Sequence, residues 1–462
     1  MRLYPSIMII LFLIASAVTA QEKNVDRNFK VNPNQRVFIN GISSIQVKIK
    51  GGDNNEGNIK INVKINSSDS RFANEYLQNF DVTYKTDGND IIIDFIETPK
   101  QGKWSVLDIF KGDFKYSFSK LITGEITLPK GVNLIGDFKY SDISVSGFDQ
   151  PLSLKGKGNH FSIKDCARVN DISNEYGDVT LINSGGRLNA ELKISPITID
   201  SFEGAVKVTT SGSSATISNI NGKLGLNAYN TKAAISDISG DVSIYSEISD
   251  LTIKQVKGYL QIYDKTGKIN VYDAGTFKLE GNKSDFSADR IASKDKIFFT
   301  TKGGTYRITN SSAPFYIDDD NSVYNLNDVT GPLFYSASNS RLTGKDLNGD
   351  WKSDTRFTEI SIEGISAQKI EAAGRGKLFK GVLSGNPKKV EIKNQEADIL
   401  LSLDSAIKTS LFMIANHGSL KSDFPVRVIN EEGISKAAER INGGGAVISL
   451  ETKDGNIKVI KH

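Results

Sequence analysis

The chain has 462 residues, of which 38% are hydrophobic and 24% charged, and its 57 basic and 54 acidic side chains give a net charge of +3. This near balance argues against a nucleic-acid partner, because neutralising phosphates requires a concentrated basic face. The single cysteine, Cys166, excludes an internal disulfide, so an apolar core must hold the fold. We expect this thiol to be buried and inert, not a nucleophile.

Residues 1–20 predict a secretory signal peptide. An arginine precedes the apolar run Ile7–Ile14, and small residues follow up to Ala20. This run is shorter than the roughly 18 apolar residues of a membrane span, and no later segment reaches that length. We therefore expect an exported protein that begins at Gln21, is periplasmic, on the outer surface or extracellular, and has no transmembrane segment after cleavage.

Residues 21–125 predict a β-rich N-terminal cap. Short runs in which apolar and polar residues alternate indicate strands with one buried face, and Ser70–Phe80 predicts one short helix after a candidate serine cap. Residues 100–120 interrupt the pattern with large aromatic residues. We interpret this insertion as a flap that covers the end of the following domain. The alternative is an exposed contact surface for a partner or a membrane.

Residues 126–365 are dominated by a repeat with a period of 18. One column at this spacing holds only Val, Ile or Leu: Val145, Ile163, Leu181, Ile199, Ile217, Ile235, Ile253 and Val271. A second column, three positions later, is apolar or small: Phe148, Cys166, Ser184, Phe202, Ile220, Ile238, Val256 and Ala274. A third consists of glycines: Gly186, Gly204, Gly222, Gly240 and Gly258.

This repeat predicts an all-β fold, a single-stranded parallel β-helix (solenoid) with about 18 residues per turn. One turn cannot bury its apolar side chains alone, so successive turns must stack; strand-crossover chirality favours right-handed coiling. The glycine column indicates a corner, and the register slips by one position near Ala274. Residues 366–462 predict a continuation of the solenoid and a C-terminal cap, because an uncovered last turn exposes a strand edge.

Four segments resemble a known bacterial family. They are Leu128–Leu134, Asp142–Phe148, the repeat Ile235–Ile244, and the ending Ile448–Val459. Together they are similar to the DUF4097 group, the putative-adhesin β-solenoids related to the head-GIN domain. The resemblance covers roughly residues 126–460 and implies an exported β-solenoid with an adhesin-like role. It implies no catalytic residue.

The sequence contains no catalytic constellation that we recognise. Its three histidines, His160, His417 and His462, are far apart and lack zinc-site spacing, and no serine nucleophile motif is present. Asp346–Asp350 opens like a calcium loop but lacks its glycine and its closing acid, so the better, though weak, metal candidate is Asp318, Asp319 and Asp320, where three carboxylates on an expected tight turn would bind Ca²⁺ weakly. We favour a solvated turn at these positions, and we expect neither a metal nor another cofactor.

Aromatic residues at outward positions are the best candidate for a binding site. Phe298, Tyr316 and Phe334 are spaced by 18 between inward positions, and Tyr245 and Tyr263 form a shorter column beside them. Such rings offer a stacking platform for a glycan or a peptide, unless a terminal cap covers them. The leading hypothesis is an exported, non-enzymatic, adhesin-like solenoid that presents a flat face to a glycan or an envelope protein. The alternatives are a structural or assembly scaffold and a carbohydrate-active β-helix enzyme.

Overall fold

The computed structural model describes residues 19–97 and 118–462. The predicted signal peptide up to residue 18, and the aromatic insertion except for its last three residues, lie outside the described residues. The fold is nearly all-β, with 73% strand and one helix, and forms a β-solenoid of about 15 turns at a spacing of about 18 residues. The predicted fold class is therefore confirmed. By its internal contacts the chain divides into two compact units, Met1–Val169 and Asn170–His462.

The first unit contains ten strands and the helix among its described residues: β1 (Thr19–Lys30), β2 (Arg36–Ser43), β3 (Ile45–Gly52), β4 (Glu56–Ser67), α1 (Ser70–Asn79), β5 (Phe80–Asp87), β6 (Asp90–Glu97), β7 (Phe118–Pro129), β8 (Asn133–Lys139), β9 (Asp142–Ser146) and β10 (Leu152–Lys164). Strands pair in the orders β1-β4-β7-β3-β9 and β5-β6-β2-β8, and β10 pairs with both β8 and β9. The pairs that include β4 or β5 are antiparallel and the others are parallel, so this unit passes from a meander into solenoid turns.

The predicted helix is present as α1, but its cap differs from the expectation. Asp69, not Ser70, is the N-cap, and its carboxylate accepts a hydrogen bond of 2.9 Å from the backbone N–H of Arg71. At the other end, Nζ of Lys23 donates to the backbone carbonyls of Leu77 and Phe80. The lysine thus stabilises the carbonyl end of the helix and turns a charged side chain inward from the edge strand β1.

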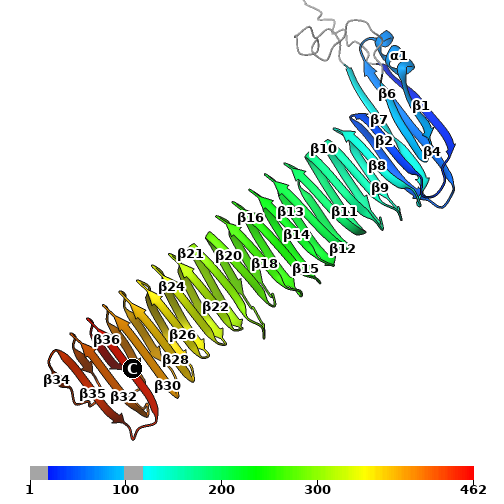
Figure 1. Ribbon diagram of the computed structural model, residues 1–462. Helices are drawn as coiled ribbons and strands as arrows, with labels where there is room; N and C mark the ends of the chain where they lie inside the picture. Colours follow the sequence, from blue (N-terminus) through cyan, green and yellow to red (C-terminus); the bar gives the residue numbers. More distant parts are fainter. Residues whose placement is uncertain (1–18, 98–117) are drawn as a thin grey trace, which may run out of the picture. The chain divides into compact units, whose positions relative to one another are not determined.

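The second unit is built almost entirely from parallel strands (Figure 1). Its strands are β11 (Val169–Lys193), β12 (Ile197–Ser211), β13 (Ser214–Asn221), β14 (Leu224–Tyr229), β15 (Lys232–Ile238), β16 (Val242–Glu247), β17 (Asp250–Val256), β18 (Leu260–Lys265), β19 (Lys268–Tyr272), β20 (Phe277–Asp289), β21 (Ile297–Ser312), β22 (Phe315–Asp320), β23 (Val323–Thr330), β24 (Leu333–Ser338), β25 (Arg341–Asn348), β26 (Trp351–Arg356), β27 (Glu359–Ser366), β28 (Lys369–Arg375), β29 (Phe379–Leu383), β30 (Lys389–Gln395), β31 (Ile399–Leu403), β32 (Thr409–Asn416), β33 (Leu420–Ser422), β34 (Ile429–Glu431), β35 (Ile434–Ile441), β36 (Ala446–Lys453) and β37 (Ile457–Lys461).

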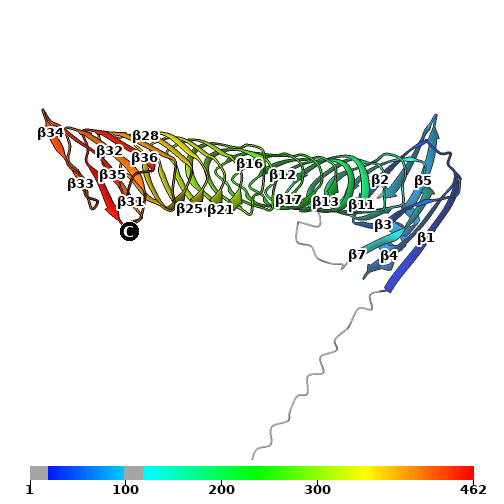
Figure 2. The same ribbon diagram turned by 90° about the horizontal axis from the view of Figure 1, so that it is seen from below.

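Each turn of this unit contributes to two parallel sheets, and the successive turns are visible edge-on in Figure 2. The first sheet has the order β12-β14-β16-β18-β20-β21-β22-β24-β26-β28-β30-β36. The second has the order β12-β13-β15-β17-β19-β20-β21-β23-β25-β27-β29-β31-β37. Strands β20 and β21 are long enough to take part in both. At the C-terminal end, β32 pairs antiparallel with β35 and parallel with β36.

Residues 18 apart are neighbours in the core, as the columns predicted. Ile217 of β13 pairs with Ile235 of β15, which pairs with Ile253 of β17, and all three are buried. The register slip is also present: Leu260 pairs with Phe277, one position short of the regular spacing. Lys278 then pairs with Phe298, two positions beyond it. Outside this region the regular spacing is retained through most of the unit.

The corners of the turns depend on left-handed backbone that the sequence analysis did not predict. One column of positive φ includes Asn219 and Asp237, and another includes Asn230 and Ile248. Asn and Asp tolerate this conformation, whereas a β-branched residue such as Ile248 does so at a cost. The glycine column meets two requirements: Gly186 and Gly204 have positive φ values of 120° and 121°, and a Cβ at Gly222 would overlap the carbonyl oxygen of the preceding turn.

Candidate functional site

The predicted aromatic columns lie side by side on the outer face of the first sheet. Phe298 of β21 pairs with Tyr316 of β22, which pairs with Phe334 of β24. Tyr245 of β16 pairs with Tyr263 of β18. In each strand the residues flanking the ring are buried, so alternation along the strand points the ring outward. We call these five rings the aromatic face.

The rings of the longer column contact one another in succession. The ring centroids of Tyr316 and Phe334 are 4.3 Å apart with an interplanar angle of 14°, so these rings stack, whereas those of Phe298 and Tyr316 are 5.4 Å apart and tilted by 38°. Nζ of Lys296 lies 4.7 Å from the centroid of the Tyr316 ring, within the range of a cation–π contact. Phe298 is 41% exposed, while Tyr316 and Phe334 are half-buried, so no described part of the chain covers the column.

The shorter column has the same construction. The rings of Tyr245 and Tyr263 are 5.3 Å apart at 10°. Tyr229 lies outside this column, since Tyr245 is paired with Asn227, and its ring has only a tilted contact of 5.7 Å to Tyr245. Tyr263, the last ring, is 46% exposed. Because rings within a column cover each other's faces, the inner rings present mainly their edges, and a free ring face remains only at a column's end.

The tight turn expected at Asp318–Asp320 is wrong. These residues are the last three of strand β22, and their burial alternates: Asp318 is exposed, whereas Asp319 is 5% exposed and faces the core. Adjacent carboxylates on opposite faces of a strand cannot converge on one cation. Within residues 19–97 and 118–462, no group of three or more His, Cys, Asp or Glu side chains is arranged to hold a metal ion.

Asp319 belongs to a polar cluster inside the solenoid. One oxygen accepts a hydrogen bond of 2.7 Å from Oγ1 of Thr301, which also lies 2.8 Å from the hydroxyl of the buried Tyr324. The other oxygen, Oδ2, has no hydrogen-bond partner among the described residues. Burial raises the pKa of the Asp319 carboxyl, and hydrogen bonds from neighbouring hydroxyls oppose this.

A second buried carboxyl, Asp264, lies on the same inward column of the first sheet. It is 1% exposed and receives a hydrogen bond from Oγ of Ser284, while its Oδ1 lacks a partner in the described part of the chain. Burial likewise raises the pKa of Asp264. Sequence reasoning missed this column, although its small and polar members are recognisable by register once the turns are aligned: Thr210, Ala228, Ser246, Asp264, Gly281, Thr301 and Asp319.

The remaining candidate groups are scattered. His160 is exposed, His417 contacts Asp454 at 3.1 Å, and His462 contacts Ser402 at 3.1 Å, so the structure does not bring the three histidines together. Cys166 is buried as expected, and burial raises the pKa of its thiol. A buried thiol with a raised pKa is a poor nucleophile.

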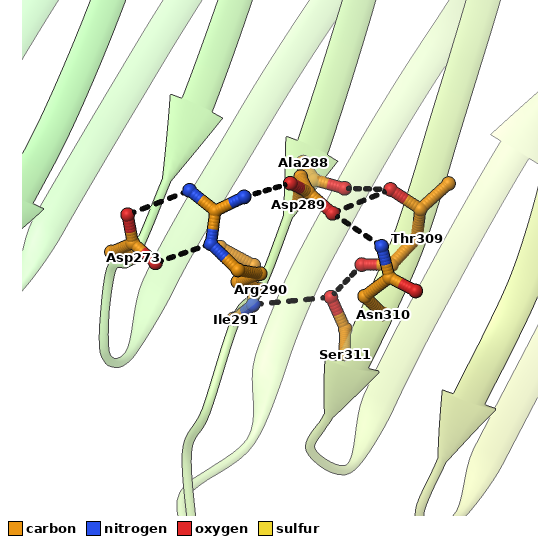
Figure 3. A network of polar contacts seen from close by, with 8 residues as sticks. All are labelled: Asp273, Ala288, Asp289, Arg290, Ile291, Thr309, Asn310 and Ser311. Carbon is orange, nitrogen blue, oxygen red and sulfur yellow. Dashed lines mark hydrogen bonds and ion pairs between the residues drawn. The ribbon is translucent and has the colours of Figure 1, made fainter.

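A polar network at one corner of the second sheet shows how outward side chains are used between turns (Figure 3). The guanidinium of Arg290 forms two hydrogen bonds, of 2.7 and 2.9 Å, to Asp273 in the turn before, and it holds the pKa of that carboxyl below its usual range. Asp289 accepts hydrogen bonds from Thr309 and Asn310 in the turn after. The hydrogen-bonding groups of these side chains pair with one another, so we assign the network to holding successive turns of the solenoid together.

Comparison with known proteins gives only distant likenesses. No family model matches the chain, and no curated protein matches it. Among solved structures, it is similar to a putative cell adhesion protein from Clostridium sporogenes, with 9% identity, a TM-score of 0.17, and coverage of 96% of this chain and 100% of that chain. It is also similar to a putative adhesin from Parabacteroides distasonis, with 13% identity, a TM-score of 0.23, and coverage of 65% and 96%.

A third solved structure, a putative adhesin from Bacteroides fragilis, is similar at 12% identity with a TM-score of 0.17, covering 64% of this chain and 97% of that chain. At these TM-scores the likenesses carry no argument about mechanism. Because no family model matches, the resemblance to the DUF4097 group stays a prediction. The one described helix is too short to cross a membrane.

Proposed function

We propose that this protein is an exported, non-enzymatic, adhesin-like solenoid that binds a glycan or an envelope protein through the aromatic face. The observation that carries the proposal is the placement of two adjacent ring columns on the outside of the first sheet, partly exposed and held by parallel strands. Rigid aromatic side chains contribute large contact area at a low cost in conformational entropy.

The positions of the perturbed acids support a non-enzymatic role. Acid–base catalysis requires a carboxyl within hydrogen-bond reach of a substrate. The two carboxyls whose pKa burial raises, Asp264 and Asp319, both face the core and are at most 5% exposed. A polymer on the outer face does not reach them, so their raised pKa reflects burial in the fold.

The proposal also includes export. Cleavage of the predicted signal peptide after Ala20 would remove the first two residues of β1, Thr19 and Ala20, which pair with Ser67 and Asn66 at the end of β4. The rest of β1 would remain paired with β4. The intact mass of protein recovered outside the cytoplasm tests this step: a mature chain that begins at Gln21 is expected, and an uncleaved chain retained in the cytoplasm would contradict it.

A glycan array with purified protein tests the binding role. The variant carrying Phe298→Ala, Tyr316→Ala and Phe334→Ala is expected to lose the glycan signals of the wild type. The matched control replaces three outward residues of the second sheet, Thr198, Thr216 and Thr252, by alanine and is expected to keep those signals. Unchanged thermal unfolding of both variants excludes a folding defect.

A protein partner is tested by photo-cross-linking in the exporting cell. A cross-linking amino acid at position 334 is expected to give one discrete product, which is absent when the same amino acid stands at position 216. The binding role is wrong if changes at the aromatic face and changes at the second sheet give the same result in both assays. In that case the scaffold alternative gains support.

A further inference from the structure

We infer that the partner is an uncharged polysaccharide, held where the two ring columns meet, on β18, β20 and β21. The patch consists of Tyr259, Gln261, Tyr263, Lys278, Glu280 and Phe298, and below it is called the β20 patch. This inference rests on the proposed function and specifies its ligand and its contact residues.

The free ring faces of the two columns point toward strand β20. Tyr263 is stacked on Tyr245 on one side, and the residue paired with it on the other side is Glu280 of β20. Phe298 contacts the ring of Tyr316 on one side, and the residue paired with it on the other side is Lys278 of β20. Consistent with this, these two end rings are more exposed than Tyr316 inside its column.

A third ring completes the patch. Tyr259 immediately precedes β18, on the same face as Tyr263, and is 41% exposed. Three rings, all about two-fifths exposed or more, therefore surround one strand. Tyr263 and Phe298 lie two strands apart and are offset by two residues along the strand, a separation of about 12 Å at the usual strand spacing and rise. This separation suits a short run of sugar residues lying across β20, with a ring at each end.

Polar groups for hydroxyl recognition lie between the rings. Nζ of Lys278 and Oε1 of Glu280 form an ion pair of 2.6 Å, which raises the pKa of the lysine, and both side chains are more than a third exposed. Gln261 is exposed between Tyr259 and Tyr263 on β18 and supplies an amide donor and acceptor. Rings that bury the apolar face of a sugar, beside groups that both donate and accept, match a polyhydroxylated ligand.

The charge pattern selects an uncharged polymer. Two acid–base pairs lie on this face near the patch, Glu247 with Lys265 at 3.0 Å and Lys278 with Glu280. A polyanion would meet Glu280 at the centre of the patch, and a polycation would meet Lys278. Only a neutral chain avoids desolvating a like charge at either position.

The test measures binding of the full chain by calorimetry to four neutral polysaccharides (mixed-linkage β-glucan, galactomannan, arabinoxylan and dextran), to polygalacturonate as the polyanion and to chitosan as the polycation. We expect at least one neutral polymer to bind and neither charged polymer to do so. Tyr259→Ala, Tyr263→Ala and Phe298→Ala are each expected to weaken this binding about tenfold, the effect of 1.4 kcal/mol. Glu280→Gln is expected to weaken it several-fold.

Tyr229→Ala is the matched control, because it removes an exposed ring of the same face that lies outside the patch. It is expected to bind as the wild type does. Binding only to polygalacturonate or chitosan, or to none of the six polymers, overturns this inference. If Tyr229→Ala and Tyr263→Ala weaken binding equally, the location is wrong. The proposed function survives each of these results if the triple variant at Phe298, Tyr316 and Phe334 loses glycan signals that its control keeps, or if position 334 gives a cross-linked product that position 216 does not.

Discussion

Replacing Ile235 by aspartate should unfold the centre of the solenoid. Ile235 is 1% exposed on β15, between Ile217 and Ile253 of the adjacent turns. Truncating a buried isoleucine costs about 2–5 kcal/mol, and burying an unpaired carboxylate adds several kcal/mol more. A total above about 5 kcal/mol approaches the whole stability of many domains. The matched variant Ser243→Asp adds the same charge at an exposed position of the next strand, β16, and should change stability by about 0.5 kcal/mol or less.

Urea unfolding followed by far-ultraviolet circular dichroism compares the two variants, and hydrogen exchange locates the damage. Exchange is needed because a stacked array can lose a few turns while the others remain folded. We expect protection to be lost first in β13, β15 and β17 of Ile235→Asp. Equal urea midpoints for the two variants would refute the reasoning, since they would mean that position 235 is no more buried than position 243.

Three further predictions concern the core and the corners. Burial raises the pKa of Asp264 and Asp319, so the stability that their protonation contributes is fully present below the ordinary value of 3.8 and is lost as pH rises through the raised pKa. The free energy of unfolding should therefore fall less steeply with pH in Asp319→Asn than in the wild type, and an unchanged slope would contradict this. Gly222→Ala should destabilise by about 1–3 kcal/mol, because its Cβ overlaps backbone, while Gly225→Ala meets only ordinary contacts and should leave the melting temperature nearly unchanged. The Cys166 thiol should react with a thiol reagent only in denaturant, and rapid labelling of the native protein would show that it is accessible.

The sequence was sufficient to predict the stacking because parallel turns in register place equivalent residues next to each other. The column through Ile217, Ile235 and Ile253 is buried throughout, and an aliphatic side chain that recurs at one fixed position of every repeat has no simpler explanation. The same logic predicted that Phe298 and Tyr316 would be neighbours. The slip of one position near Ala274 was also recognisable, but the excess of two positions that follows between β20 and β21 was not predicted.

The spacing of the repeat did not predict features that depend on the direction of a side chain or on the backbone conformation at a corner. The left-handed conformation of Ile248 contradicts its intrinsic preference and is imposed by its place in a column that otherwise suits Asn230. Asp319 was expected on a surface turn because aspartate is rarely buried, yet strand alternation in β22 places it inside. Ring stacking within the aromatic face depends on rotamers, about which the period of the repeat gives no information.

The ends of the two ring columns explain why a binding site should lie at β20 and not elsewhere along the first sheet. The columns run two residue positions apart across the sheet, and β20 supplies no ring to either of them: Tyr263 is paired with Glu280, and Phe298 with Lys278. One ring face is therefore left uncovered at each of these ends, and the Lys278–Glu280 pair lies between them. Replacing Glu280 by tyrosine would extend the shorter column onto β20 and cover the free face of Tyr263. This variant is expected to preserve the core, because position 280 points outward between buried neighbours, while weakening binding.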